Sequence, residues 1–310
     1  MSVSRFSRRQ VIQAGAASLG VATWGTLLAQ PSAANTAALA ALTGPERLKR
    51  LVEGAKKEGV VSIYTSMPQD DMAALTNAFE AKYGVKAKVW RSGSEKILQR
   101  GLLEAKANRF EVDVFETNSP EMEVLSREKV LIAGNSPFLS ELIPQAIPAH
   151  KEWIATRLNI FTCAYNTKLV RKEDLPKTYQ DLLDPKWKGQ LGIEGNNHAW
   201  FGALMAKMGE EDGQKLFANI ANTNGISNRK GHSLLTMMVS SGEVPLALTV
   251  YSWNPEQVKI KGAPVEGLAL QPLMAQPSTI AMLKKAPNPY TALLFYDYML
   301  TEGQKQLNDL

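Results

Sequence analysis

Hydroxyl, amide and arginine side chains recur where predicted strands end and predicted helices begin. In a parallel α/β sheet, the carboxyl ends of strands and the amino ends of helices share one edge, where free N–H groups favour anions. The same residue types also cap helices, but four such loops together predict a shared ligand-binding cleft. The residues concerned are Thr65, Ser66, Arg91, Ser92, Ser94, Thr117, Asn118, Asn196 and Asn197.

Residues arranged for catalysis are scarce in this sequence. It contains no G-x-S-x-G elbow, no Walker pattern and no H-E-x-x-H motif. Asp70 and Asp71 are adjacent, so on a helix their side chains point apart. Cys163 is the single cysteine, and the three histidines share no metal-ligand spacing. We therefore predict a protein that is not an enzyme and carries no cofactor.

The N-terminus resembles an export signal. Three arginines and no acid lie within Met1–Gln13, and Ser7–Ile12 reads SRRQVI, the twin-arginine pattern. A mostly apolar run of about 16 residues follows, short of the ~20 needed to span a bilayer. Small residues then precede Asn35. We predict a twin-arginine signal peptide over residues 1–34, cleaved after Ala34, and a mature protein located in the periplasm.

Composition and charge indicate an ordinary globular protein. Apolar residues make up 45% of the chain and charged residues 21%. The net charge of +5 includes three arginines of the leader, whose removal leaves 32 basic and 30 acidic residues. No block of lysine and arginine resembles a nucleic-acid-binding stripe. We therefore predict no nucleic-acid partner.

Hydrophobic periodicity predicts alternating strands and helices, which is typical of α/β lobes. Helices are predicted at 45–58, 69–83, 95–107, 199–208, 212–222, 233–241 and 289–307. Strands are predicted at 60–64, 85–90, 112–115, 154–165, 190–194, 244–250, 268–273 and 279–283. The segment 137–148 contains several prolines and reads as a connection.

Several segments together resemble the family 1 extracellular solute-binding proteins of ABC importers, including their ferric-ion-binding branch. They are VVSIYTS, EVDVFETN, YNTKLV, LLDPKWKGQLGI, GEVPLALTVY and EGQKQL. The resemblance covers about Arg47 to Leu310. It implies the α/β fold of a type II periplasmic binding protein, with two lobes joined by crossover strands that act as a hinge. Family members commonly continue past the EGQ-containing helix, whereas this chain stops at Leu310.

The resemblance also implies a division of the chain and a set of partners. Lobe 1 is expected to contain residues 35–157 and 260–296, and lobe 2 residues 158–259 and 297–310. The expected partners are a small-molecule ligand and the permease subunits of an ABC importer. We expect a monomer.

The ferric-binding branch holds iron with a histidine in the first-strand loop, a glutamate after the third strand and two consecutive tyrosines near the hinge. This chain has no histidine in Thr65–Gln69, and Asn118 stands in place of the glutamate. Tyr251 and Ser252 replace the tyrosine pair. Ferric iron prefers several anionic oxygens, so bare iron is disfavoured.

A small anionic or zwitterionic organic solute suits these loops better. Trp200, Tyr251 and Trp253 offer aromatic faces, and the hydroxyl and amide groups named above offer neutral donors. Arg91 or Arg229 offers a bidentate contact to a carboxylate or phosphonate. Two alternatives stay open: a receptor for ferric iron or a ferric chelate, with Tyr251 as metal ligand, and an exported enzyme on the same fold.

Overall fold

The computed structural model describes residues 33–309, which lie within one compact unit. The predicted signal peptide lies outside the described residues except for its last two positions, which begin helix α1 (Ala33–Ala40). Among the described helices, none combines the length and the apolar character needed to cross a membrane.

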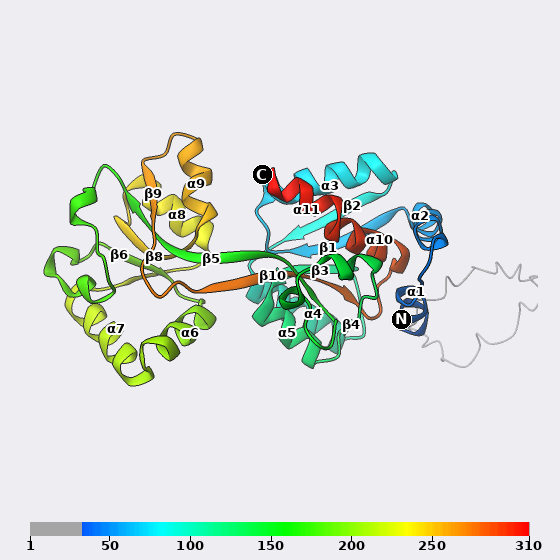
Figure 1. Cartoon of the computed structure of the whole chain (residues 1–310), viewed down its shortest axis with the longest axis horizontal. Coiled ribbons are helices and arrows are strands. Elements are labelled where there is room, and N and C mark those ends of the chain that lie inside the picture. The colour runs from blue at the N-terminus through cyan, green and yellow to red at the C-terminus, as the bar shows by residue number, and fades with distance from the viewer. Residues whose placement is uncertain (1–32, 310) are drawn as a thin grey trace, which may run out of the picture. The chain divides into compact units, whose positions relative to one another are not determined.

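The predicted alternation of strands and helices is present, with several changes at the boundaries (Figure 1). The helices are α2 (Glu46–Glu58), α3 (Gln69–Tyr83), α4 (Ser94–Lys106), α5 (Ser119–Arg127), α6 (His198–Met208), α7 (Glu210–Asn224), α8 (His232–Ser241), α9 (Trp253–Ile260), α10 (Pro289–Leu300) and α11 (Glu302–Asn308). The strands are β1 (Val60–Thr65), β2 (Lys86–Arg91), β3 (Val114–Asn118), β4 (Leu131–Ile132), β5 (Ile154–Asn166), β6 (Leu191–Glu194), β7 (Ser227–Arg229), β8 (Leu246–Tyr251), β9 (Val265–Leu268) and β10 (Ala275–Leu283).

The strands join in the order β2-β1-β3-β10-β5-β8-β6-β7, with β4 beside β10 and β9 beside β5. The first half of β5 pairs with β10, and its second half, from Phe161 onward, pairs with β8 and β9. These two long strands therefore connect two α/β lobes, as Figure 1 shows. The expected two-lobed fold of a periplasmic binding protein, with crossover strands between the lobes, is confirmed.

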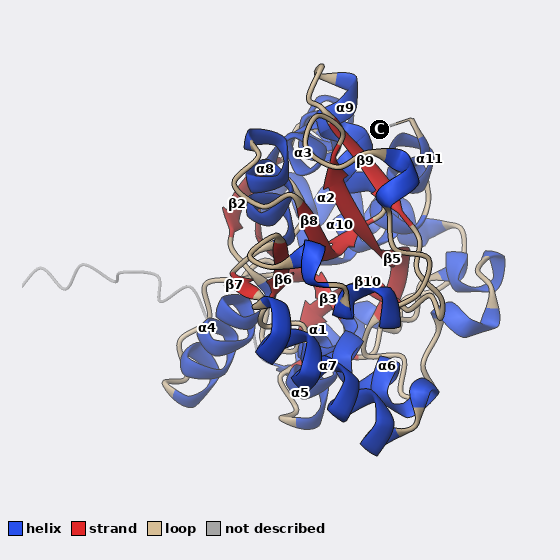
Figure 2. Cartoon of the chain, turned by 90° about the vertical axis from the view of Figure 1, so that its left-hand side faces the viewer, coloured by secondary structure: helices blue, strands red, loops and turns tan. Residues whose placement is uncertain are grey.

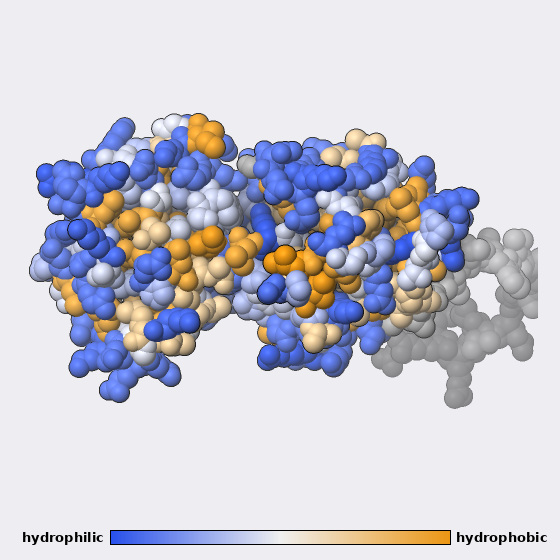
Figure 3. All heavy atoms as spheres, viewed as in Figure 1, coloured by the Kyte–Doolittle hydropathy of each residue, from blue (hydrophilic) through white to orange (hydrophobic). Residues whose placement is uncertain are grey.

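Each lobe has its own hydrophobic core, with helices packed on the strands (Figure 2). In lobe 1, the rings of Phe79 and Phe295 meet edge to face with their centroids 5.1 Å apart. In lobe 2, Trp187 and Leu246 lie in the core. On the face in Figure 3, hydrophilic residues cover most of the outer surface, while apolar residues gather nearer the middle.

The C-terminal helices α10 and α11 belong to lobe 1, which corrects the expected assignment of residues 297–310 to lobe 2. The Tyr298 hydroxyl donates to the carbonyl of Leu75 at 3.0 Å, and its ring lies 5.4 Å from that of Phe79. The physical reason is topological: β10 carries the chain back into lobe 1, and a short link then leads into α10.

Residues 260–274 likewise lie in lobe 2 rather than in lobe 1 as expected. Strand β9 pairs with the second half of β5, and Val265 is fully enclosed in a lobe 2 cluster. The predicted strand at 268–273 is absent, because β9 already ends at Leu268. The predicted helix at 289–307 is split at Thr301, whose φ of −122° and ψ of −94° are not helical.

Helix α10 begins against two carboxylates that satisfy its first N–H groups. Asp113 accepts the backbone N–H groups of Ser62 and Asn288, each at 2.7 Å. Glu58 accepts those of Tyr290 and Thr291 at 3.1 and 2.8 Å. Negative charge at a helix N-terminus is favourable, but burial, together with a smaller effect of the Glu58 charge, raises the pKa of Asp113 to about 7.

The raised pKa of Asp113 predicts that the folded protein loses stability as the pH rises from about 4 toward 7. An unfolded aspartate, with a pKa of about 3.9, is ionised in this window, whereas buried Asp113 keeps its proton, so the folded state binds more protons. Urea unfolding at pH 5 and pH 8 should show lower stability at pH 8, and Asp113→Asn should reduce that difference. An equal difference in both proteins would contradict the prediction.

Candidate ligand-binding cleft

A cleft of about 680 Å³ lies between the two lobes. In lobe 1 its walls are the loops after β1, β2 and β3, and in lobe 2 they are the loops after β6, β7 and β8. Strands β5 and β10 contribute the remaining wall. Within each lobe the three strands run parallel, so their carboxyl ends lie at the same edge of the sheet.

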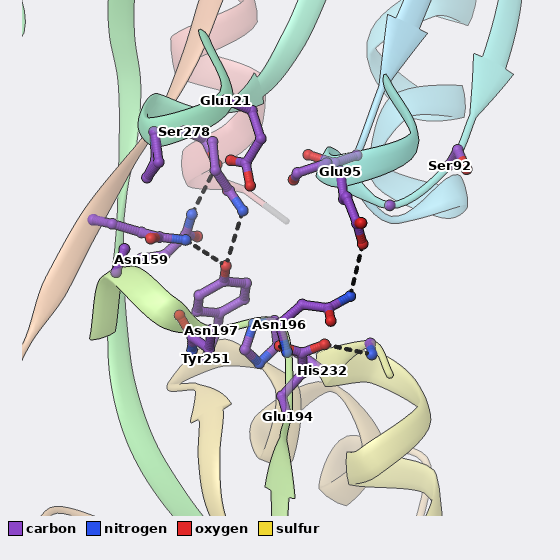
Figure 4. A pocket seen from close by; sticks show the side chains of 18 of the residues that line it. Ser92, Glu95, Glu121, Asn159, Glu194, Asn196, Asn197, His232, Tyr251 and Ser278 are labelled. Atoms are coloured by element: carbon purple, nitrogen blue, oxygen red, sulfur yellow. Dashed lines mark hydrogen bonds between the residues drawn. The ribbon is translucent and has the colours of Figure 1, made fainter. Parts of the chain in front are cut away.

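Most of the residues predicted to bind ligand line this one cleft, although they come from five separate loops. Figure 4 shows several of them around the same space. Their contact with a ligand stays a prediction. The cleft-lining residues of the predicted set are Ser66, Arg91, Ser92, Ser94, Asn118, Asn196, Asn197, Tyr251 and Trp253.

Two of the predicted hydroxyl residues lie inside the sheet instead. Thr65 is fully buried, and its Oγ1 donates to Glu116 Oε2 at 2.5 Å. Thr117 is also fully buried. Successive side chains of a strand point to opposite faces, so in β3 only Asn118 of the pair Thr117–Asn118 reaches the cleft.

Trp200 and Arg229 are also placed away from the cleft. Trp200 is only 2% exposed and packs in the lobe 2 core, 6.0 Å from the ring of Phe217. It lies on the face of α6 that is turned toward α7 and the core. The Arg229 guanidinium pairs with Glu243 at 3.2 Å. In the sequence alone, a tryptophan or arginine near a loop is as compatible with core packing or a surface ion pair as with ligand binding.

Sequence reasoning missed four polar residues of the connecting strands. Arg157 and Asn159 of β5, and Gln276 and Ser278 of β10, line the cleft. Asn159 Nδ2 donates to Ser278 Oγ at 2.8 Å across the two strands. Each pair is spaced two residues apart, so both members face the same side of a strand. This alternation of polar residues within predicted strands is the signal that could have found them.

Charged residues of both signs line the cleft. The basic side chains are Arg91, Lys96, Arg157 and Lys230, and the acidic ones are Glu95, Glu121 and Glu194. The helices α4, α5, α6 and α8 begin at the cleft, so the positive ends of their dipoles are directed toward it. The cleft can therefore hold an anionic group and has carboxylates for a positive one.

Tyr251 lies at the centre of this arrangement (Figure 4). Its oxygen accepts hydrogen bonds from Asn118 Nδ2 at 3.2 Å and from Gln276 Nε2 at 2.8 Å. Burial raises the pKa of Tyr251. Its ring stacks on that of Trp253, with centroids 5.8 Å apart. Because the Tyr251 oxygen already accepts two hydrogen bonds, the neutral phenol can offer a ligand only its O–H group as a donor.

His232 packs against Tyr251, with its ring centroid 4.1 Å from that of Tyr251. Its Nδ1 lies 3.2 Å from the carbonyl oxygen of Thr249. Because a carbonyl can only accept, Nδ1 carries the proton of the neutral ring, which leaves Nε2 as an acceptor. Burial lowers the pKa of His232, although the nearby Glu194 carboxylate opposes this effect.

Hydrogen bonds already join the two lobes at the cleft. Asn118 of lobe 1 donates to Tyr251 of lobe 2, and Asn196 Nδ2 of lobe 2 donates to Glu95 Oε2 of lobe 1 at 3.0 Å. Near the hinge, Gln257 Nε2 donates to Asp71 Oδ1 at 3.4 Å. These three bonds hold the two lobes in contact.

The two lobes, the crossover strands and the polar cleft between them define a solute-binding protein. Residues 142–308 match the family described as bacterial extracellular solute-binding protein, and the chain belongs to that family. The family and the related structures are solute-binding proteins, which agrees with the expectation that the chain is not an enzyme.

A curated relative is the Fe(3+)-binding periplasmic protein of Serratia marcescens, which is 26% identical over 202 residues. The match covers 64% of this chain and 58% of the relative, so it spans less than two thirds of that protein. This likeness agrees with the expected resemblance to the ferric-ion-binding branch.

Two solved structures share the fold. Iron-bound HitA from Pseudomonas aeruginosa has a TM-score of 0.69 at 23% identity, with coverage of 81% of this chain and 84% of HitA. AfuA from Actinobacillus pleuropneumoniae, solved with fructose-6-phosphate bound, has a TM-score of 0.73 at 24% identity, with coverage of 81% and 82%. At these identities the likeness establishes the fold alone.

Proposed function

We propose that the chain is the periplasmic substrate-binding component of an ABC importer. It captures a small anionic or zwitterionic organic solute between its lobes and delivers it to the permease subunits. The solute contacts both lobes, so it stabilises the closed form by its higher affinity for that form. No covalent step is needed for this function.

The observation that carries the organic-solute proposal is the size and lining of the cleft. Its volume of about 680 Å³ lies within the range of about 300–1,000 Å³ typical of small-molecule sites. Four helix N-termini and the side chains of Ser92, Ser94 and Asn197 supply neutral donors around it. Such donors favour a carboxylate, phosphate or phosphonate group.

Ferric iron, free or as a chelate, is the second candidate, and the described functions of the relatives favour it. The Serratia relative is described as binding Fe(3+), and HitA was solved with iron bound. In this chain Tyr251 would supply a phenolate ligand. Among the described residues 33–309, no group of three or more His, Cys, Asp or Glu side chains is placed to hold a metal ion.

A thermal-shift screen of the purified chain separates the two candidates. The compounds are carboxylates, phosphate esters, phosphonates, amino acids, polyamines, and ferric salts with and without citrate. A solute at ~100 times its dissociation constant should stabilise the folded state by ~2.7 kcal/mol. We expect a shift with an organic anion in the absence of iron. A shift with iron alone, together with a phenolate-to-iron absorption band, would contradict the organic-solute proposal.

A further inference from the structure

Two buried polar atoms on opposite walls of the cleft have no hydrogen-bond partner. One is Oε2 of Glu121, in the first turn of α5 in lobe 1, and the other is Nδ2 of Asn197, which precedes α6 in lobe 2. Asn197 is only 8% exposed. Figure 4 labels both residues at the cleft. Leaving such atoms unpaired costs free energy, so each is suited to a group that the ligand supplies.

The other two carboxylates of the cleft are engaged within the protein. Glu194 accepts the backbone N–H groups of Asn196 and Gly231, both at 3.0 Å. Glu95 accepts from Asn196 Nδ2 at 3.0 Å and from Gln99 Nε2 at 3.2 Å. Glu194 therefore fixes the two lobe 2 loops and already occupies the N-terminus of α8. Glu121 differs from both because one of its oxygens is free to accept.

The surroundings of Glu121 favour a positive group. Burial raises the pKa of Glu121, and the charges of Glu95 and Glu194 raise it further. Among the basic side chains of the cleft, Arg157 is directed elsewhere, because its guanidinium lies 3.9 Å from the carboxylates of both Asp71 and Glu116. A ligand ammonium beside Glu121 would offset the repulsion among the three glutamates and satisfy the free oxygen.

The surroundings of Asn197 favour the opposite charge. Its side-chain N–H group is unpaired, and α6, which starts at His198, is long enough to have a full set of free N–H groups at its first turn. The N-terminus of α6 carries no acidic residue in its first turn. An anionic group can therefore accept from Asn197 Nδ2 and from the first N–H groups of α6 together.

We propose that the solute is a zwitterion that lies across the cleft, with its ammonium group against Glu121 in lobe 1 and its anionic group against Asn197 and the start of α6 in lobe 2. This inference rests on the proposed function. Glu121 is then the residue that selects amine-bearing anions over anions that lack an amine. Because each end contacts a different lobe, only a ligand with both charges uses both unpaired atoms.

Matched pairs of compounds test the inference. The pairs are β-alanine and propionate, O-phosphoethanolamine and ethyl phosphate, and glucosamine 6-phosphate and glucose 6-phosphate. Calorimetry on the full chain should show that, in at least one pair, the amine-bearing member binds about ten to a hundred times more tightly, the range of a hydrogen bond between charged groups. Glu121→Gln should abolish that preference while retaining the weaker affinity for the anion.

A control variant on the same helix is Glu123→Gln. Glu123 contacts Arg127, His150 and Trp153 outside the cleft, so its loss should leave the preference intact. Both variants are first checked for an unchanged unfolding midpoint. If Glu121→Gln does not fold, Glu121→Asp should reduce the preference because the shortened carboxylate reaches less far.

The outcomes separate this inference from the proposed function. Equal binding of both members of every responsive pair, or an unchanged preference in Glu121→Gln, would overturn the zwitterion while leaving an organic anion as the solute. Binding of none of the six compounds at 10 mM, with or without a response to iron, would overturn both proposals.

Discussion

Tyr251→Phe is expected to weaken solute binding about tenfold and to lower the free energy of unfolding by about 1–3 kcal/mol. The substitution removes the oxygen that accepts from Asn118 Nδ2 and Gln276 Nε2. Gln276 is only 8% exposed, so its amide cannot turn to bulk water without rearrangement. The ring remains to pack against His232 and to stack on Trp253, so the cleft keeps its aromatic wall.

The same variant discriminates between the candidate ligands. Iron would lose an anionic oxygen ligand, so its affinity should fall by far more than tenfold, whereas an organic solute loses one hydrogen bond. Titration calorimetry gives the affinities, and urea unfolding gives the stability.

Tyr165→Phe is the matched control for this experiment. Tyr165 is a buried tyrosine of lobe 2 whose hydroxyl lies 3.2 Å from Glu266, and it does not line the cleft. Its loss should leave binding unchanged. Unaltered affinity in Tyr251→Phe would remove Tyr251 from the binding site.

Asp297→Ala is expected to lower the free energy of unfolding by about 3–5 kcal/mol, because it leaves a buried positive charge without its partner. Arg47 Nη2 lies 3.0 Å from Asp297 Oδ1, and the two side chains are 3% and 7% exposed. Burial raises the pKa of Asp297, and the arginine opposes this effect. The pair joins α2 to α10, so its loss should loosen the C-terminal helices from lobe 1.

Asp174→Ala serves as the control, because Asp174 forms an even shorter pair, 2.7 Å, with Arg171 on the surface. Exposed pairs contribute little, so we expect no resolvable change in urea unfolding. The double variant Arg47→Met with Asp297→Leu should recover most of the stability that Asp297→Ala loses. A loss in Asp297→Ala no larger than in the control would contradict the prediction.

Most helices and strands, and the meeting of the polar loops at one edge of the sheet, were predictable from local sequence patterns. The helix predicted at 69–83 matches α3, and the polar residues after β1, β2 and β3 meet at one edge because parallel strands must end together. These predictions depend on periodicity and on strand direction, which a short window of sequence contains.

The contacts between distant segments were not predictable in the same way. Most of the residues described as buried in α10, from Pro289 to Leu300, are apolar, which indicates a core helix but not which core. Trp200 packs in the lobe 2 core, but the same apolar ring could also have packed against a ligand. Arg157 and Asn159 lie in a strand that was predicted, yet their role depends on where β5 passes between the lobes. Which core or cleft such a residue reaches is determined by the topology of the whole chain.

The hydrogen bonds that join the lobes have a kinetic consequence. Asn118 with Tyr251, and Asn196 with Glu95, connect residues that line the cleft. A solute enclosed between the joined lobes can leave only after these bonds break and the lobes part. The bonds therefore lengthen the residence time of the solute, and we expect its release to be limited by the rate at which the lobes open.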